Sequence, residues 1–257
     1  MPLMATFREA AAAVPQLAVA TSAASPIRIV WRALIFCYGL AMPQGSVADV
    51  IYVHGLWLNG QESLVLRRRL TRGLACRMHV FHYASVAASM EQITDSLQAL
   101  IARVAPRTLL HFVGHSLGGL VIYRFLERFP QTLPGRVVFL GTPAVASAAA
   151  TGAAQRISIA RTMLGRCVGD ELLCEHERRW RFDRPLGVIA GTHALGLGQF
   201  VAQFDEPNDG SVAVSETRID GATDHIELPV SHMGMLVSRE VARATEHFLR
   251  EGRFALV

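Results

Sequence analysis

A serine flanked by glycines stands out in this 257-residue chain as a group that could do chemistry. Ser116 occupies the centre of a G-x-S-x-G pattern at 114–118. The apolar run 109–113 predicts a buried strand before it, and 117–129 predicts a helix after it. Ser116 would then lie on a sharp strand-to-helix turn that presents its hydroxyl as a nucleophile. The alternative is that the glycines serve only the packing of that turn.

A serine nucleophile needs a base to accept its proton, and ten histidines compete for this role. We favour His232, because Ser231-His232-Met233-Gly234 is expected to be a loop between the last strand and the last helix. His225 is the alternative base, although its position is more typical of a structural histidine. His54 lies beside the first loop and is expected to support it.

The base in turn needs an acid that orients its ring. The turn signature Asn208-Asp209-Gly210 lies between Ser116 and His232, so Asp209 completes the order Ser, Asp, His. The alternative is that Asp209 forms an Asx turn and only accepts hydrogen bonds from backbone donors. The reserve candidates for the acid are Asp205, Glu206 and Asp224.

Two backbone N–H groups are expected to stabilise the negative charge that develops on a substrate carbonyl. One is that of Leu117, at the positive N-terminus of the predicted helix. The other is that of Leu56, in His54-Gly55-Leu56 after the first expected strand. Trp57 could alternatively be a packing residue. Three apolar side chains near these groups are expected to bind the acyl part of a substrate: Trp57, Leu58 and Met233.

Strands and helices alternate from residue 47 onward, which predicts an α/β fold with a mostly parallel sheet and helices on both faces. Ligands bind beyond the carboxyl ends of the strands in such sheets, where Ser116 and Leu56 are expected. The expected strands are 47–53, 78–83, 109–113, 136–140, 186–190 and 216–220. The expected helices are 61–74, 89–104, 117–129 and 235–249.

Residues 143–182 interrupt this alternation. Two helices fit there, at about 144–164 and 169–179. A long excursion between two core strands often covers a site, so 143–182 is expected to be a short helical cap insertion; an ordinary surface pair of helices is the alternative. Residues 47–257 would form one α/β domain with this insertion, and 1–46 would form an N-terminal appendage.

The composition is typical of a globular protein, with 51% hydrophobic and 18% charged residues. All 25 basic residues are arginine, and the net charge is +4. The basic runs 67–69 and 177–184 are typical of solvated helix faces, so no nucleic-acid partner is expected. The four cysteines show no zinc spacing, so no metal site is expected. Cys167 and Cys174 could pair, but nothing in the pattern requires a disulfide.

The N-terminal region contains the apolar run 33–42, which is shorter than the roughly 20 residues that span a bilayer. We therefore expect no integral membrane span and a cytoplasmic location. Arg28 and Arg32 precede the run, and Ser46-Val47-Ala48 fits a cleavage site, so a secretory signal is the alternative. Met42 is an alternative start.

The motifs together resemble the α/β-hydrolase superfamily, in particular its bacterial lipases and esterases and the inositol-deacylase-like group. The resemblance covers about 47–250 and implies hydrolysis of a small-molecule ester or lipid through an acyl-serine intermediate, with no cofactor. The region 1–46 has no counterpart, and the usual first two strands are missing. The motifs that carry the resemblance, in chain order, are YVHGLW (52–57), GHSLGG (114–119), Gly-Thr-Pro (141–143), NDGSV (208–212) and SHMGM (231–235).

Other functions fit the same residues. An acyltransferase would use the same acyl-enzyme and an alcohol or thiol acceptor. A thioesterase or amidase would cleave a different bond, because the pocket and the leaving group decide substrate choice. A non-catalytic binding protein would more typically have lost the serine, the acid or the histidine. Nothing in the sequence specifies an oligomeric state.

Overall fold

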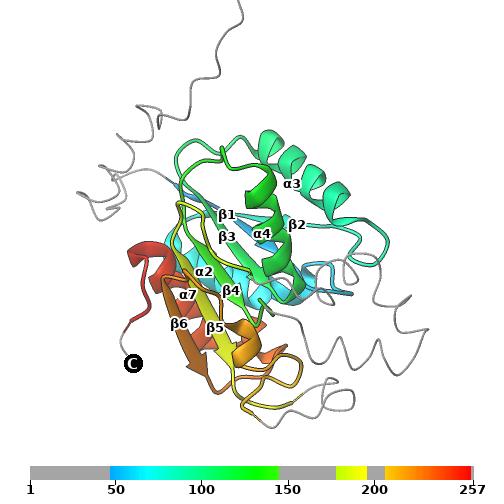
Figure 1. The fold of residues 1–257 in the computed structure, drawn as a ribbon. Coiled ribbons are helices and arrows are strands. Elements are labelled where there is room, and N and C mark those ends of the chain that lie inside the picture. The colour runs from blue at the N-terminus through cyan, green and yellow to red at the C-terminus, as the bar shows by residue number, and fades with distance from the viewer. Residues whose placement is uncertain (1–46, 145–177, 196–205, 256–257) are drawn as a thin grey trace, which may run out of the picture. The chain divides into compact units, whose positions relative to one another are not determined.

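The computed structural model describes residues 47–144, 178–195 and 206–255. These residues form a six-stranded sheet in the order β2-β1-β3-β4-β5-β6, with every pairing of neighbouring strands parallel (Figure 1). The chain runs from β1 outward to β2 and then returns to the other side of β1 with β3. Ligand sites lie at such a reversal of strand order. The strands are β1 (Asp49–Val53), β2 (Arg77–Phe81), β3 (Leu110–His115), β4 (Val137–Leu140), β5 (Leu186–Gly191) and β6 (Asp224–Leu228).

Helices cover both faces of the sheet (Figure 1). On one face, α3 (Met90–Val104) and α4 (Leu117–Arg128) share a core with Ile51 and Val53 of β1. On the other face, α2 (Leu64–Leu74) and α7 (Arg239–Glu251) share a core with Val50 and Tyr52. Because successive side chains of a strand point to opposite faces, a strand covered on both sides is apolar throughout. The expected α/β architecture is confirmed.

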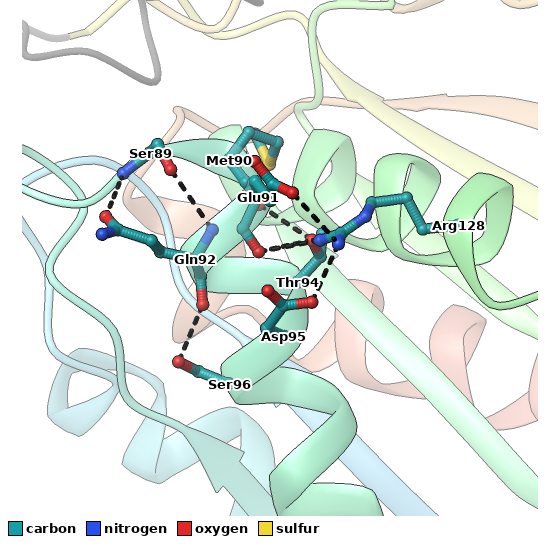
Figure 2. A network of polar contacts seen from close by, with 8 residues as sticks. All are labelled: Ser89, Met90, Glu91, Gln92, Thr94, Asp95, Ser96 and Arg128. Atoms are coloured by element: carbon teal, nitrogen blue, oxygen red, sulfur yellow. Dashed lines mark hydrogen bonds and ion pairs between the residues drawn. The ribbon is translucent and has the colours of Figure 1, made fainter.

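A polar network joins the N-terminus of α3 to the last turn of α4 (Figure 2). Ser89 caps α3 in a capping box with Gln92, in which each side chain accepts a hydrogen bond from the other residue's backbone N–H. From α4, Arg128 Nη1 donates to Glu91 C=O at 2.8 Å, and Arg128 Nη2 lies 2.9 Å from Asp95 Oδ1. These contacts join the first turns of α3 to the last turn of α4.

The prediction of a sixth strand at 216–220 is wrong. Ser215–Thr217 form a short 3-10 helix, and the sixth strand is β6, which pairs with β5 from Gly187↔Asp224 to Gly191↔Leu228. Strand β6 lies at the edge of the sheet and is only half-buried. It can therefore contain the polar residues Asp224, His225 and Glu227, and it lacks the continuous apolar run that is typical of a central strand.

The expected final helix at 235–249 also starts too early. Gly234–Leu236 form a 3-10 turn, and α7 begins after Ser238, whose side chain accepts from the N–H groups of Glu240 and Val241. Arg178 and Arg179 are not helical, although the expected helix 169–179 included them. The remainder of both expected insertion helices lies outside the described residues, as do the expected appendage 1–46, the reserve acid Asp205, Cys167 and Cys174.

The two described ends of the insertion meet beside the 3-10 helix. Ala144 N–H donates to Glu216 C=O at 2.6 Å, and Arg178 Nη1 donates to Ala144 C=O at 3.0 Å. The Glu216 carboxylate also accepts from Ala213 N–H at 2.9 Å, in the turn that follows Asp209.

Within the described ranges, no helix is both long enough and apolar enough to cross a membrane.

Candidate active site

Ser116 lies on the turn between β3 and α4, as the pattern predicts. Its backbone has φ 54° and ψ −125°, a conformation that costs energy for any residue with a Cβ. Ser116 N–H donates to Leu140 C=O at the end of β4 (2.9 Å), and Ser116 C=O accepts from Gly119 N–H (3.0 Å). Ser116 is partly exposed, whereas His115 and Leu117 are buried. The turn therefore presents the serine to solvent at the carboxyl end of a central strand.

The glycines around Ser116 let α4 begin unusually close to the sheet. A Cβ on Gly118 would lie 2.1 Å from Val53 O, and one on Gly114 would lie 2.6 Å from Gly119 Cα. These distances are too short for any side chain, so glycine is required at both positions. The packing interpretation of the glycines is thus correct, and this same packing is what holds the serine on its strained turn.

Asp209 and His232 lie in contact. Asp209 Oδ2 is 2.6 Å from His232 Nδ1, and His232 N–H donates to Asp209 C=O at 2.8 Å. Asp209 Oδ1 accepts from the N–H groups of Ser211 (2.9 Å) and Val212 (2.7 Å). The carboxylate is 1% exposed. Asp209 therefore forms the Asx turn through Oδ1 and contacts the histidine through Oδ2, so the two interpretations are compatible.

Gly141 brings this pair to the end of β4. It has φ +54°, and a Cβ there would lie 2.8 Å from Asp209 Oδ2 and 3.1 Å from His232 Nδ1. The residue before it, Leu140, accepts the hydrogen bond from Ser116 N–H. The serine turn and the Asp-His pair thus lie near each other, at the carboxyl ends of the neighbouring strands β3 and β4.

The loop after β1 lies against the serine turn. A Cβ on Gly55 would lie 3.1 Å from Ser116 Cβ. The loop closes with Leu58 N–H donating to Gly55 C=O (3.4 Å), while Trp57, at φ 59°, donates its N–H to Ser85 Oγ (3.0 Å). Within the parts of the chain that the structure describes, the N–H groups of Leu56 and Leu117 have no hydrogen-bond partner.

His54 orients the peptide group that carries Leu56 N–H. Its Nε2 lies 3.3 Å from Tyr83 N and accepts that N–H, so the proton sits on Nδ1, which donates to Gly55 C=O at 2.8 Å. Burial lowers the pKa of His54, which keeps the ring neutral, and the ring stacks on Tyr83 at 4.2 Å. Because C=O and N–H of a trans peptide point in opposite directions, holding Gly55 C=O fixes where Leu56 N–H points.

The other acid and base candidates lie in structural positions. His225 is on β6, where its Nε2 meets Thr217 Oγ1 at 2.9 Å, and burial lowers its pKa. Asp224 accepts from the N–H groups of His225 and Phe254. Glu206 accepts from Ser215 Oγ at 2.7 Å. Among the described residues, no group of three His, Cys, Asp or Glu side chains is placed to hold a metal ion.

The three expected substrate-binding side chains differ in exposure. Trp57 is 60% exposed and Met233 is 47% exposed, whereas Leu58 is partly buried. Two neighbours of the site had no role assigned to them from the sequence. Gly141 had a signal in the Gly-Thr-Pro motif, and His115 had one in its place beside Ser116 at the end of an apolar run.

No protein-family profile matches this sequence, and no curated protein matches it either. Solved structures do match in fold. The mature form of lipase BlEst2 from Bacillus licheniformis is 16% identical, with a TM-score of 0.64 over 81% of this chain and 93% of that one. Phospholipase PlaB from Legionella pneumophila is 15% identical, with a TM-score of 0.61 over 79% and 57%. Pyrethroid hydrolase PytH is 17% identical, with a TM-score of 0.57 over 79% and 98%.

Proposed function

We propose, from the premise that this chain has the α/β-hydrolase fold, that it is a serine hydrolase of carboxylic esters. The observation that carries the proposal is the 2.6 Å contact between Asp209 Oδ2 and His232 Nδ1 beside the strained Ser116 turn. A buried carboxylate on Nδ1 keeps the ring proton on that nitrogen and leaves Nε2 to accept a proton. In this proposal Ser116 is the nucleophile, His232 is the base and Asp209 is the acid.

The proposed reaction uses only groups of this chain. His232 Nε2 accepts the Ser116 hydroxyl proton as Oγ attacks the carbonyl carbon of the ester. The N–H groups of Leu56 and Leu117 stabilise the oxyanion that forms. His232 then gives its proton to the leaving alcohol, which yields the acyl-serine. A water molecule, deprotonated by His232, releases the acid and restores Ser116.

The proposed substrate has an apolar acyl group. Trp57 and Met233 flank the oxyanion loop and the base, and both expose large apolar surfaces. Such surfaces favour hydrocarbon over a sugar or a charged acid. The lipase, phospholipase and pyrethroid hydrolase names of the similar structures agree with a small-molecule ester or lipid.

The test is hydrolysis of p-nitrophenyl esters from acetate to palmitate by the wild type and Ser116→Ala. We expect Ser116→Ala to lose about 10⁴-fold or more in kcat, because the nucleophile is gone. Ser96→Ala, on the exposed face of α3, is the matched control and should keep full activity. A folded Ser116→Ala protein with unchanged turnover would contradict the proposal. Parallel assays with a thioester, and with an added alcohol acceptor, separate thioesterase and acyltransferase activity from ester hydrolysis.

A further inference from the structure

His115 is a buried histidine that the proposed mechanism does not use. It is the last residue of β3 and directly precedes Ser116. The residue is 0% exposed, and its ring packs against that of His232 with 4.6 Å between centroids and 44° between planes. His115 Nε2 lies 3.1 Å from His232 O. The strand that carries the serine is therefore bonded directly to the loop that carries the base.

The hydrogen-bond partners define the protonation of His115. Burial, and secondarily the neighbouring His232 and His54, lower the pKa of His115 well below 6.5, so the ring is neutral near pH 7. A neutral imidazole carries one proton. His115 Nδ1 has no partner among the described residues, while Nε2 faces a carbonyl oxygen. Nε2 therefore carries the proton and donates to His232 C=O.

This bond supplies the third anchor of the His232 residue. Asp209 supplies the other two, since it holds His232 N–H through its own carbonyl and Nδ1 through its carboxylate. Both of those anchors come from the acid's turn, and neither fixes the base relative to β3. The His115 ring also lies near the loop after β1, where a Cβ added to Gly55 would lie 3.3 Å from His115 Nδ1.

We propose that His115 is a positioning residue: its Nε2–H bond to the His232 carbonyl sets the base at a fixed distance from Ser116. The inference rests on the proposed function and adds a fourth side chain to it. His115 makes no contact with substrate and moves no proton. Because the His115 ring is neutral, it does not repel the positive charge that forms on the nearby His232 ring during the reaction.

The experiment compares His115→Leu with His115→Gln in the full chain. Leucine fills the space without a donor, whereas the glutamine amide can reach the position of Nε2 and donate to the carbonyl. We expect His115→Leu to lower kcat about 10- to 100-fold with KM changed less than about threefold, because misplacement of a catalytic group by about 1 Å has effects of this size. His115→Gln should recover kcat to within about fivefold of the wild type. The control is His225→Gln, which replaces a histidine remote from the site.

A double-mutant cycle separates positioning from a general loss of structure. If His115 acts through His232, then adding His115→Leu to His232→Ala should change the residual rate less than about twofold. An equal loss in both backgrounds, or a wild-type kcat in folded His115→Leu, would overturn the inference while Ser116→Ala still tests the proposed function independently. Activity that survives Ser116→Ala would overturn both. Should His115→Leu fail to fold, His115→Asn, whose amide is too short to reach the carbonyl, replaces it in every comparison.

Discussion

Replacing Asp209 by asparagine changes the chemistry of the acid while keeping its size, and the structure dictates how the new amide must lie. Oδ1 accepts from the N–H groups of Ser211 and Val212, so that position has to keep an oxygen. The reversed amide would face two N–H donors with its own NH₂ group, and each buried donor left unpaired costs about 1–3 kcal/mol. The NH₂ group of Asp209→Asn therefore lies at the Oδ2 position, 2.6 Å from His232 Nδ1.

This orientation puts His232 in the wrong tautomer. An NH₂ group can only donate, so Nδ1 has to accept and the ring proton moves to Nε2. A protonated Nε2 cannot take the proton of Ser116. The expected loss in kcat is about 10⁴-fold, which corresponds to about 5 kcal/mol of barrier height.

The assay is steady-state hydrolysis of a short p-nitrophenyl ester, with thermal unfolding measured on the same samples. Asp209→Asn keeps both hydrogen bonds of the turn, so its free energy of unfolding should stay within about 1 kcal/mol of the wild type. Asp209→Ala leaves both N–H groups unpaired and should lose at least about 2 kcal/mol more. A kcat of Asp209→Asn within about tenfold of the wild type would refute the assignment of Asp209 as the acid.

Two further predictions concern pH and substrate. Burial and the nearby Arg136 and Arg184 lower the pKa of His111 to about 3 from 6.5, so the folded protein binds this proton more weakly than the unfolded chain and loses stability as pH falls below 6.5. Between pH 7.5 and 5 the free energy of unfolding of the wild type should fall about 2 kcal/mol more than that of His111→Asn, measured by urea denaturation; parallel curves would contradict this. Trp57→Ala should lower kcat/KM for long-chain esters about tenfold and hardly affect the acetate ester, because only long acyl chains would bury the indole; an equal loss at every chain length would exclude an acyl-binding role.

The architecture could be predicted because the strands β1, β3, β4 and β5 are covered on both faces and therefore read as continuous apolar runs. The same reasoning fails at the sheet edge, where Asp224 and His225 of β6 remain partly exposed and interrupt the pattern. It also misplaces the start of α7, because Met235 and Leu236 are buried and extend the apolar periodicity past Ser238, which is the true N-cap.

The sequence shows the order of the candidate site residues along the chain, but it does not show the contacts between them. Ser116, Asp209 and His232 each follow a local signature of a turn or loop. The bond between His115 and the His232 carbonyl joins positions 117 residues apart, and it depends on how two loops meet rather than on any local pattern. The left-handed conformation of Trp57 likewise has no signal in the sequence, since bulky residues rarely adopt it.

The contacts at Ala144 and Arg178 bear on how this chain can diverge during evolution. Ala144 donates to Glu216 C=O and accepts from Arg178, so the chain leaves the sheet and rejoins it at one place. Glu216 also holds Ala213 N–H in the turn after Asp209. Because Glu216 binds Ala144 through its carbonyl and Ala213 through its carboxylate, a substitution at Glu216 during evolution would disturb both the point where the chain leaves the sheet and the turn of the acid.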